Sequence, residues 1–206
     1  MSKKKIIFGL ILLATVSAAL FFYFRLGKDL VRNTDQHEED TLNWVTTKNG
    51  SLHIKTFKGD SLNDSPNLVF VIHGDAPFNK PGYQYLMAKN IADSNRNTVA
   101  IGILRPGYTD SEEITSNGVR GLTNGDNYTL ENIEAIAEVI ERLKEVYHPG
   151  KTIVVGHSGG AAIAGDIIGM YSDLSNAAVL VSCPCNVPKF REHMKVLQNN
   201  PIWGAK

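Results

Sequence analysis

A serine flanked by glycines carries the clearest chemical signal in this sequence. Ser158 stands in a G-x-S-x-G motif, between a β-branched run at 151–155 and a run of small and apolar residues at 161–171. A serine at a sharp turn from a strand to a helix exposes its hydroxyl for attack, so this setting predicts a nucleophile elbow. Glycines relieve the crowding that such a turn imposes, and the alternative interpretation is a glycine-rich structural turn. The five residues of the motif are Gly156, His157, Ser158, Gly159 and Gly160.

The elements that must position Ser158 alternate between strand and helix patterns. Asn49-Gly50 lies between two strand-like runs, which predicts an antiparallel hairpin with His53 on its polar face. Further strands are predicted at 67–72, 98–104, 151–155 and 177–182, with helices around 83–91, 129–147 and 161–171 between them. Thr129 is expected to cap its helix. This order predicts an α/β fold in which helices cover both faces of a mostly parallel sheet.

The ordered set of motifs resembles the α/β-hydrolase superfamily over roughly residues 44–188. The motifs are the hairpin, His73-Gly74-Asp75, Arg105-Pro106-Gly107-Tyr108 and the GHSGG elbow. The resemblance implies a serine hydrolase that acts on an ester, amide or thioester of a small acyl compound through an acyl-enzyme. It implies no metal and no cofactor.

Roles for individual residues follow from this resemblance. Ser158 matches the catalytic nucleophile, and the backbone N–H groups of Gly159 and Asp75 match the oxyanion hole. The remaining elbow residues, Gly156, His157 and Gly160, match structural positions. The family often has a glycine where Asp75 stands, and a carboxylate is unfavourable near a developing negative charge. We therefore expect the Asp75 side chain to point away, or the loop to have diverged.

The resemblance also implies an acid and a histidine base, which the family supplies from loops after the seventh and eighth strands. The sequence reaches Lys206 shortly after its sixth predicted strand, so we expect a hydrolase domain that is incomplete at the C-terminus. Beyond Ser158 the candidates are His193, expected in a later helix, and two aspartates, Asp166 and Asp173, in and at the far end of the elbow helix. A non-catalytic, membrane-anchored binding module and an inactive fragment stay open as alternatives.

Composition adds few constraints on function. The 206 residues balance 21 Lys and Arg against 21 Asp and Glu, so no charge excess indicates a nucleic-acid partner. Cys183 and Cys185 are one residue apart, a poor spacing for a mutual disulfide, so we expect buried or idle thiols. Residues 178–182 are expected to form an apolar sheet edge. The oligomeric state is not readable from the sequence.

The N-terminus has the pattern of a membrane segment. An uncharged run from Ile6 to Phe24 follows Lys3–Lys5, and its length is just enough to span a bilayer as a helix. We expect a signal anchor at 1–25, a polar linker at 26–43 and a partial α/β-hydrolase domain at 44–206. The protein would then be a single-pass membrane protein with its C-terminal domain outside the cytoplasm. A signal peptide cleaved near 16–18, giving a secreted or periplasmic protein, is the alternative.

Overall fold

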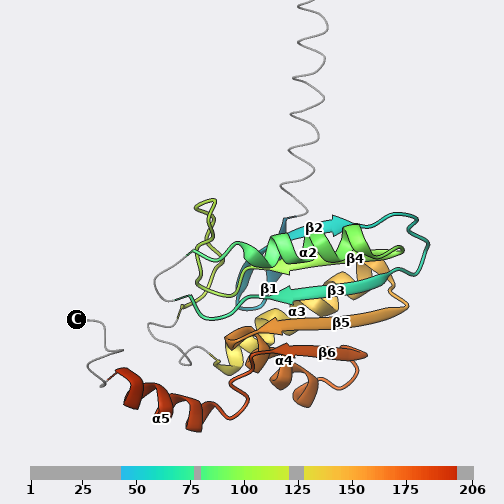
Figure 1. The fold of residues 1–206 in the computed structure, drawn as a ribbon. Coiled ribbons are helices and arrows are strands. Elements are labelled where there is room, and N and C mark those ends of the chain that lie inside the picture. Colours follow the sequence, from blue (N-terminus) through green and yellow to red (C-terminus); the bar gives the residue numbers. More distant parts are fainter. Residues whose placement is uncertain (1–42, 77–79, 121–127, 199–206) are drawn as a thin grey trace, which may run out of the picture. The chain divides into compact units, whose positions relative to one another are not determined.

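Six strands form one sheet in the computed structural model, which describes residues 43–76, 80–120 and 128–198 (Figure 1). The strands lie in the order β1-β2-β4-β3-β5-β6. Their bounds are β1 Trp44–Thr47, β2 Gly50–Lys58, β3 Asn67–Ile72, β4 Thr98–Ile103, β5 Lys151–His157 and β6 Ala177–Val181. The pairs β1–β2 and β2–β4 are antiparallel, and the other three pairs are parallel. The predicted mostly parallel sheet is confirmed.

Helices cover both faces of this sheet, as predicted. The helices are α2 Tyr83–Ser94, α3 Leu130–Tyr147, α4 Gly159–Met170 and α5 Val187–Gln198. Alternate residues of β3 point to opposite faces. Val69 and Val71 pack with Ala88 and Ala92 of α2, whereas Phe70 packs among apolar residues of α3 and α4. Figure 1 shows α2 and α3 on opposite sides of the sheet.

The hairpin is confirmed, but its polar face is not where the sequence pattern puts it. The ring of His53 is buried, with Nδ1 3.0 Å from the hydroxyl of Tyr85, which donates to Asp110 at 2.9 Å. Tyr85 belongs to α2, and Asp110 belongs to the loop after β4. These two segments cover the face of β2 that alternation alone would leave to solvent. The prediction that His53 is on a polar face was therefore wrong.

The strand β6 is an exposed edge, as predicted. Among the described residues it pairs only with β5, at the end of the strand order. Its apolar side chains keep large exposed fractions: 48% for Val179, 40% for Leu180 and 38% for Val181. An apolar edge with free backbone groups is a template for pairing with another chain.

A disulfide joins Cys183 and Cys185 immediately after β6. Ser182 has a positive φ of 52°, and the turn that follows brings the two Cα atoms to 5.1 Å, within the ordinary range for a disulfide. Cys185 is exposed and Cys183 is half-buried. The expectation of buried or idle thiols was wrong. A tight turn gives these two closely spaced cysteines a Cα–Cα distance that a disulfide can bridge.

The predicted membrane segment, Ile6–Phe24, lies outside the described residues. Within the three described ranges, no helix combines the length and the apolar character that crossing a bilayer requires.

Candidate functional site

Ser158 occupies the turn between β5 and α4, as the motif predicts. Its backbone has φ 52° and ψ −119°, a region that costs a non-glycine residue about 1–3 kcal/mol. Hydrogen bonds hold this conformation: the Ser158 N–H donates to Val181 O at 2.8 Å, and Ser158 O accepts from the N–H of Ala161 at 2.9 Å. The serine therefore lies at the carboxyl end of β5 and at the N-terminus of α4.

The elbow leaves no space for side chains at the two outer glycines. A Cβ on Gly160 would lie closer than 3.0 Å to the carbonyl oxygens of Ile72 and His73, at the end of β3. A Cβ on Gly156 would lie equally close to the Gly160 carbonyl oxygen. The first turn of α4 thus packs directly against the backbone of β3 and β5.

His157 and Tyr83 hold the loop after β3 beside the elbow. The Gly74 N–H donates to the Tyr83 hydroxyl at 2.6 Å, and this hydroxyl lies 2.8 Å from His157 Nδ1. Burial raises the pKa of the Tyr83 phenol, so Tyr83 stays protonated while its oxygen accepts from the Gly74 N–H and shares a hydrogen bond with His157. A Cβ on Gly74 would come within 2.9 Å of the Ser158 Cβ, so this loop lies against Ser158.

The Asp75 side chain points toward the elbow. A Cβ on Gly159 would lie closer than 3.0 Å to Asp75 Oδ1 and to the Tyr128 hydroxyl. Arg105 Nη1 donates to Asp75 Oδ1 at 2.9 Å, and the Tyr128 hydroxyl donates to Oδ2 at 2.6 Å. Of the two expectations for Asp75, a side chain turned away was therefore wrong. The carboxylate lies close to Gly159, where it pairs with the Arg105 guanidinium and accepts a hydrogen bond from the Tyr128 phenol.

Arg105 connects the ends of β3 and β4. Its side chain is 1% exposed, and its guanidinium carbon lies 5.0 Å from the centre of the Tyr108 ring. Its backbone N–H donates to His73 Nε2 at 3.0 Å. Because Nε2 accepts, His73 Nδ1 carries the proton and donates to Gly74 O at 2.7 Å. Burial, followed by the charge of Arg105, lowers the pKa of His73 well below 6.5. His73 is thus a neutral residue whose ring connects the backbone of Arg105 to that of Gly74.

The histidine and the aspartates downstream of Ser158 do not approach it. Asp166 is exposed on α4, and Asp173 is exposed just beyond the end of that helix. His193 lies on α5, with its side chain exposed. Among the described residues, no hydrogen bond joins the Ser158 hydroxyl to a base. Nor does any group of three or more His, Cys, Asp or Glu there have an arrangement suited to a metal ion.

Tyr83 and Tyr128 are the site residues that sequence reasoning missed. Tyr83 begins α2, where its spacing marks only a helix face, and Tyr128 precedes the Thr129 cap without a motif of its own. Burial, followed by the hydrogen bond to Asp75, raises the pKa of Tyr128, which therefore stays a donor. No local pattern reveals either phenol, because each forms its hydrogen bond with the loop after β3 and not with its own sequence neighbours.

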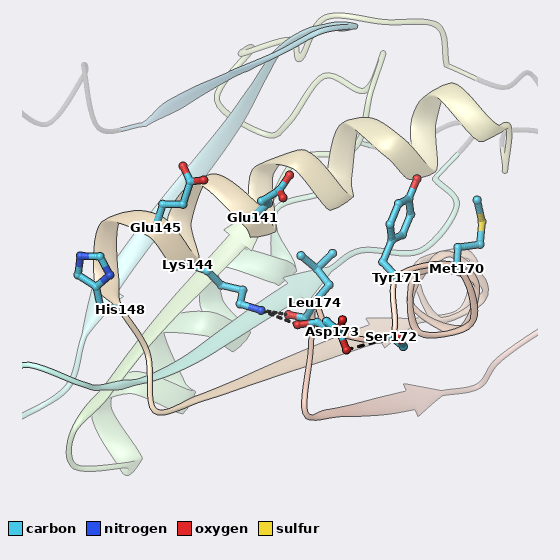
Figure 2. Close-up of a pocket in the computed structure, with 9 residues that line it drawn as sticks. All are labelled: Glu141, Lys144, Glu145, His148, Met170, Tyr171, Ser172, Asp173 and Leu174. Carbon is cyan, nitrogen blue, oxygen red and sulfur yellow. Dashed lines mark hydrogen bonds between the residues drawn. The ribbon is translucent and has the colours of Figure 1, made fainter.

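A separate cavity of about 700 Å³ opens between the C-terminal ends of α3 and α4 (Figure 2). Lys144 crosses it and donates to the carbonyl oxygens of Asp173 and Leu174 at 2.8 and 2.9 Å. The lining residues are Glu141, Lys144, Glu145, His148, Met170, Tyr171, Ser172, Asp173 and Leu174. The cavity lies near the start of β5, whereas Ser158 follows its end, roughly 20 Å along the strand. Of the predicted site residues, Asp173, one of the candidate acids, lines it, and Ser158 does not.

Comparisons with known proteins place these features in a family. A family model described as "Alpha/beta hydrolase family" matches residues 68–205. Est1E from Butyrivibrio proteoclasticus with bound ferulic acid has a similar structure, with a TM-score of 0.57 and 14% sequence identity. That alignment covers 73% of this chain and 56% of Est1E. An esterase from Exiguobacterium antarcticum matches with a TM-score of 0.48 and 18% identity, over 68% of this chain and 45% of that one.

The chain therefore spans only about half the length of these solved structures. At such identities the likeness concerns the fold. No curated protein matches the sequence.

Proposed function

Because this chain belongs to the alpha/beta hydrolase family, we propose that it hydrolyses an ester, amide or thioester of a small acyl compound through Ser158. The observation that supports this proposal is the strained backbone of Ser158 at the β5–α4 turn, with φ 52° and ψ −119°. A turn of this kind presents the hydroxyl at the carboxyl edge of the sheet. Glycine would adopt this conformation without strain, so the strained serine favours a nucleophile elbow over a glycine-rich structural turn.

The proposed reaction begins when Ser158 Oγ attacks the substrate carbonyl carbon and loses its proton to a base. The carbonyl oxygen becomes an oxyanion, which the backbone N–H groups of Gly159 and Asp75 would stabilise. Gly159 is the first residue of α4, so the positive end of the helix dipole adds to this stabilisation. Collapse of the tetrahedral intermediate releases the alcohol, amine or thiol and leaves an acyl-enzyme, which water then hydrolyses.

A fluorophosphonate probe tests this function on the full chain. We expect covalent labelling of Ser158, detected as a mass shift on the peptide that contains it, and complete loss of that label in Ser158→Ala. Added imidazole supplies an external base and reports on the internal one. It will accelerate labelling if the protein brings no base to Ser158, and it will have little effect otherwise.

Absence of labelling in folded protein, with and without imidazole, would overturn the hydrolase proposal. The chain would then be a binding module or an inactive fragment. Circular dichroism before and after the reaction establishes that the labelled and unlabelled samples are folded.

We also propose that the protein is membrane-anchored through Ile6–Phe24, with the hydrolase domain outside the cytoplasm. The Cys183–Cys185 disulfide supports this location, because disulfides persist mainly in oxidising compartments. The expected result is a membrane fraction whose protein retains its N-terminal peptide when analysed by mass spectrometry. A mature protein that starts near Ala19 would instead establish cleavage, and recovery in the cytosolic fraction would refute both locations.

A further inference from the structure

Asp75 and Arg105 form a buried ion pair next to Gly159, the first residue of α4. The side chains are 7% and 1% exposed, and Arg105 Nη1 lies 2.9 Å from Asp75 Oδ1. The second carboxylate oxygen accepts from the Tyr128 hydroxyl at 2.6 Å. Three segments that are far apart in sequence thus meet at one carboxylate: the loop after β3, the end of β4 and the residue before the Thr129 cap.

The carboxylate and the Tyr128 phenol fill the space that a side chain at position 159 would occupy. Both Asp75 Oδ1 and the Tyr128 hydroxyl lie closer than 3.0 Å to the Cβ position of Gly159. The nitrogen of Gly159 belongs to the same residue and is one of the two proposed oxyanion donors. The ion pair is therefore adjacent to the position where negative charge would develop during acyl transfer.

The geometry also restrains the guanidinium of Arg105. Its carbon lies 5.0 Å from the centre of the Tyr108 ring and 5.6 Å from that of Tyr128, so the cation is flanked by two aromatic faces. Its Nη1 is also 3.4 Å from the carbonyl oxygen of His73. Arg105 consequently contacts both ends of the short segment from His73 to Asp75.

We infer that Arg105 and Tyr128 are positioning residues for the acyl-transfer step, because they hold the Asp75 carboxylate against Gly159. This inference rests on the proposed function. Holding the side chain fixes the loop whose Asp75 N–H would face the oxyanion. Pairing the carboxylate with Arg105 also cancels a negative charge that would otherwise oppose the oxyanion. The arrangement explains how an aspartate can stand at a position where the family often has glycine.

Inactivation kinetics with the fluorophosphonate separate positioning from binding. In Arg105→Met we expect the rate constant of the chemical step to fall about 100-fold, the loss typical of one oxyanion donor, with reagent affinity almost unchanged. Tyr128→Phe removes one hydrogen bond and is expected to slow the same step by about tenfold. The double variant Asp75→Asn/Arg105→Met should recover part of the loss, because it no longer carries an unpaired carboxylate.

Matched substitutions at distant sites serve as controls. Arg142→Met changes an exposed arginine of α3, and Tyr147→Phe changes a half-buried tyrosine near the end of that helix. Both should keep the wild-type rate constant. Arg105→Met and Tyr128→Phe rates that match those of the controls would overturn the inference. So would a loss confined to reagent affinity.

Hydrogen exchange of the backbone amides at 73–76 tests, without any labelling, whether Arg105 holds this loop in place. We expect exchange to accelerate about tenfold or more in Arg105→Met and to stay unchanged in Arg142→Met. Equal exchange rates in wild type and Arg105→Met would show that Arg105 does not hold this loop in place. A wild-type protein that the probe does not label would instead overturn the proposed function, while the exchange measurement still decides whether Arg105 holds this loop. Tyr128→Phe provides the same comparison if Arg105→Met does not fold.

Discussion

Gly160→Ala is expected to lower the free energy of unfolding by about 3 kcal/mol, at the upper end of the range for overpacking. The added methyl group would lie closer than 3.0 Å to the carbonyl oxygens of Ile72 and His73. These are backbone atoms at the end of β3, which pairs with β4 and β5 on its two sides and therefore cannot shift locally. Guanidinium denaturation followed by circular dichroism measures the change.

Gly169 offers a control in the same helix. A Cβ at this position meets nothing within 4 Å, so Gly169→Ala should stabilise the protein by about 0.5–1 kcal/mol through helix propensity alone. A Gly160→Ala protein as stable as Gly169→Ala would contradict the close approach of α4 to β3. The two substitutions add the same methyl group, so only the surroundings differ.

Acidification below pH 6.5 is expected to destabilise the domain through His73. Burial and the neighbouring charge of Arg105 lower the pKa of His73 well below 6.5 in the folded protein. Above pH 6.5 neither the folded nor the unfolded state protonates this ring, and its neutral contacts are fully available. As the pH falls below 6.5, only the unfolded chain binds the proton, so stability decreases by up to about 1.4 kcal/mol per pH unit.

Comparison of His73→Gln with His148→Gln isolates this effect. Glutamine cannot take up a proton, so His73→Gln should flatten the decline in unfolding free energy between pH 7 and pH 5. His148 is exposed at the end of α3, and His148→Gln should retain the wild-type slope. Parallel pH profiles for the two variants would show that His73 is not the group responsible.

Local patterns predicted the fold because most of its determinants are local. Short β-branched runs gave β3, β4 and β5, which are buried on both faces as central strands of a parallel sheet must be. The Thr129 side chain caps α3 by accepting from the Asn132 N–H at 3.4 Å, as expected from a threonine before an apolar stripe. The strand–turn–helix setting of Ser158 was likewise readable from neighbouring residues.

The site depends on contacts that no local pattern encodes. The partners of Asp75 come from positions 30 and 53 residues away, Arg105 and Tyr128, so the direction of its carboxylate could not be inferred from the loop alone. The same reason explains His53, whose burial is set by Tyr85 and Asp110. The prediction for Cys183 and Cys185 was wrong for a different reason. It judged the distance between the two residues from their spacing in the sequence and did not consider the turn between them.

The backbone of Ser158 is hydrogen-bonded to β6, an edge strand of the described sheet. The Ser158 N–H donates to the carbonyl of Val181, the last residue of β6, and Val181 is 38% exposed. Fraying of this strand end would release the hydrogen bond that holds the strained serine turn. We therefore expect a peptide or antibody bound along β6 to change the reactivity of Ser158, by holding this strand end in place or by displacing it.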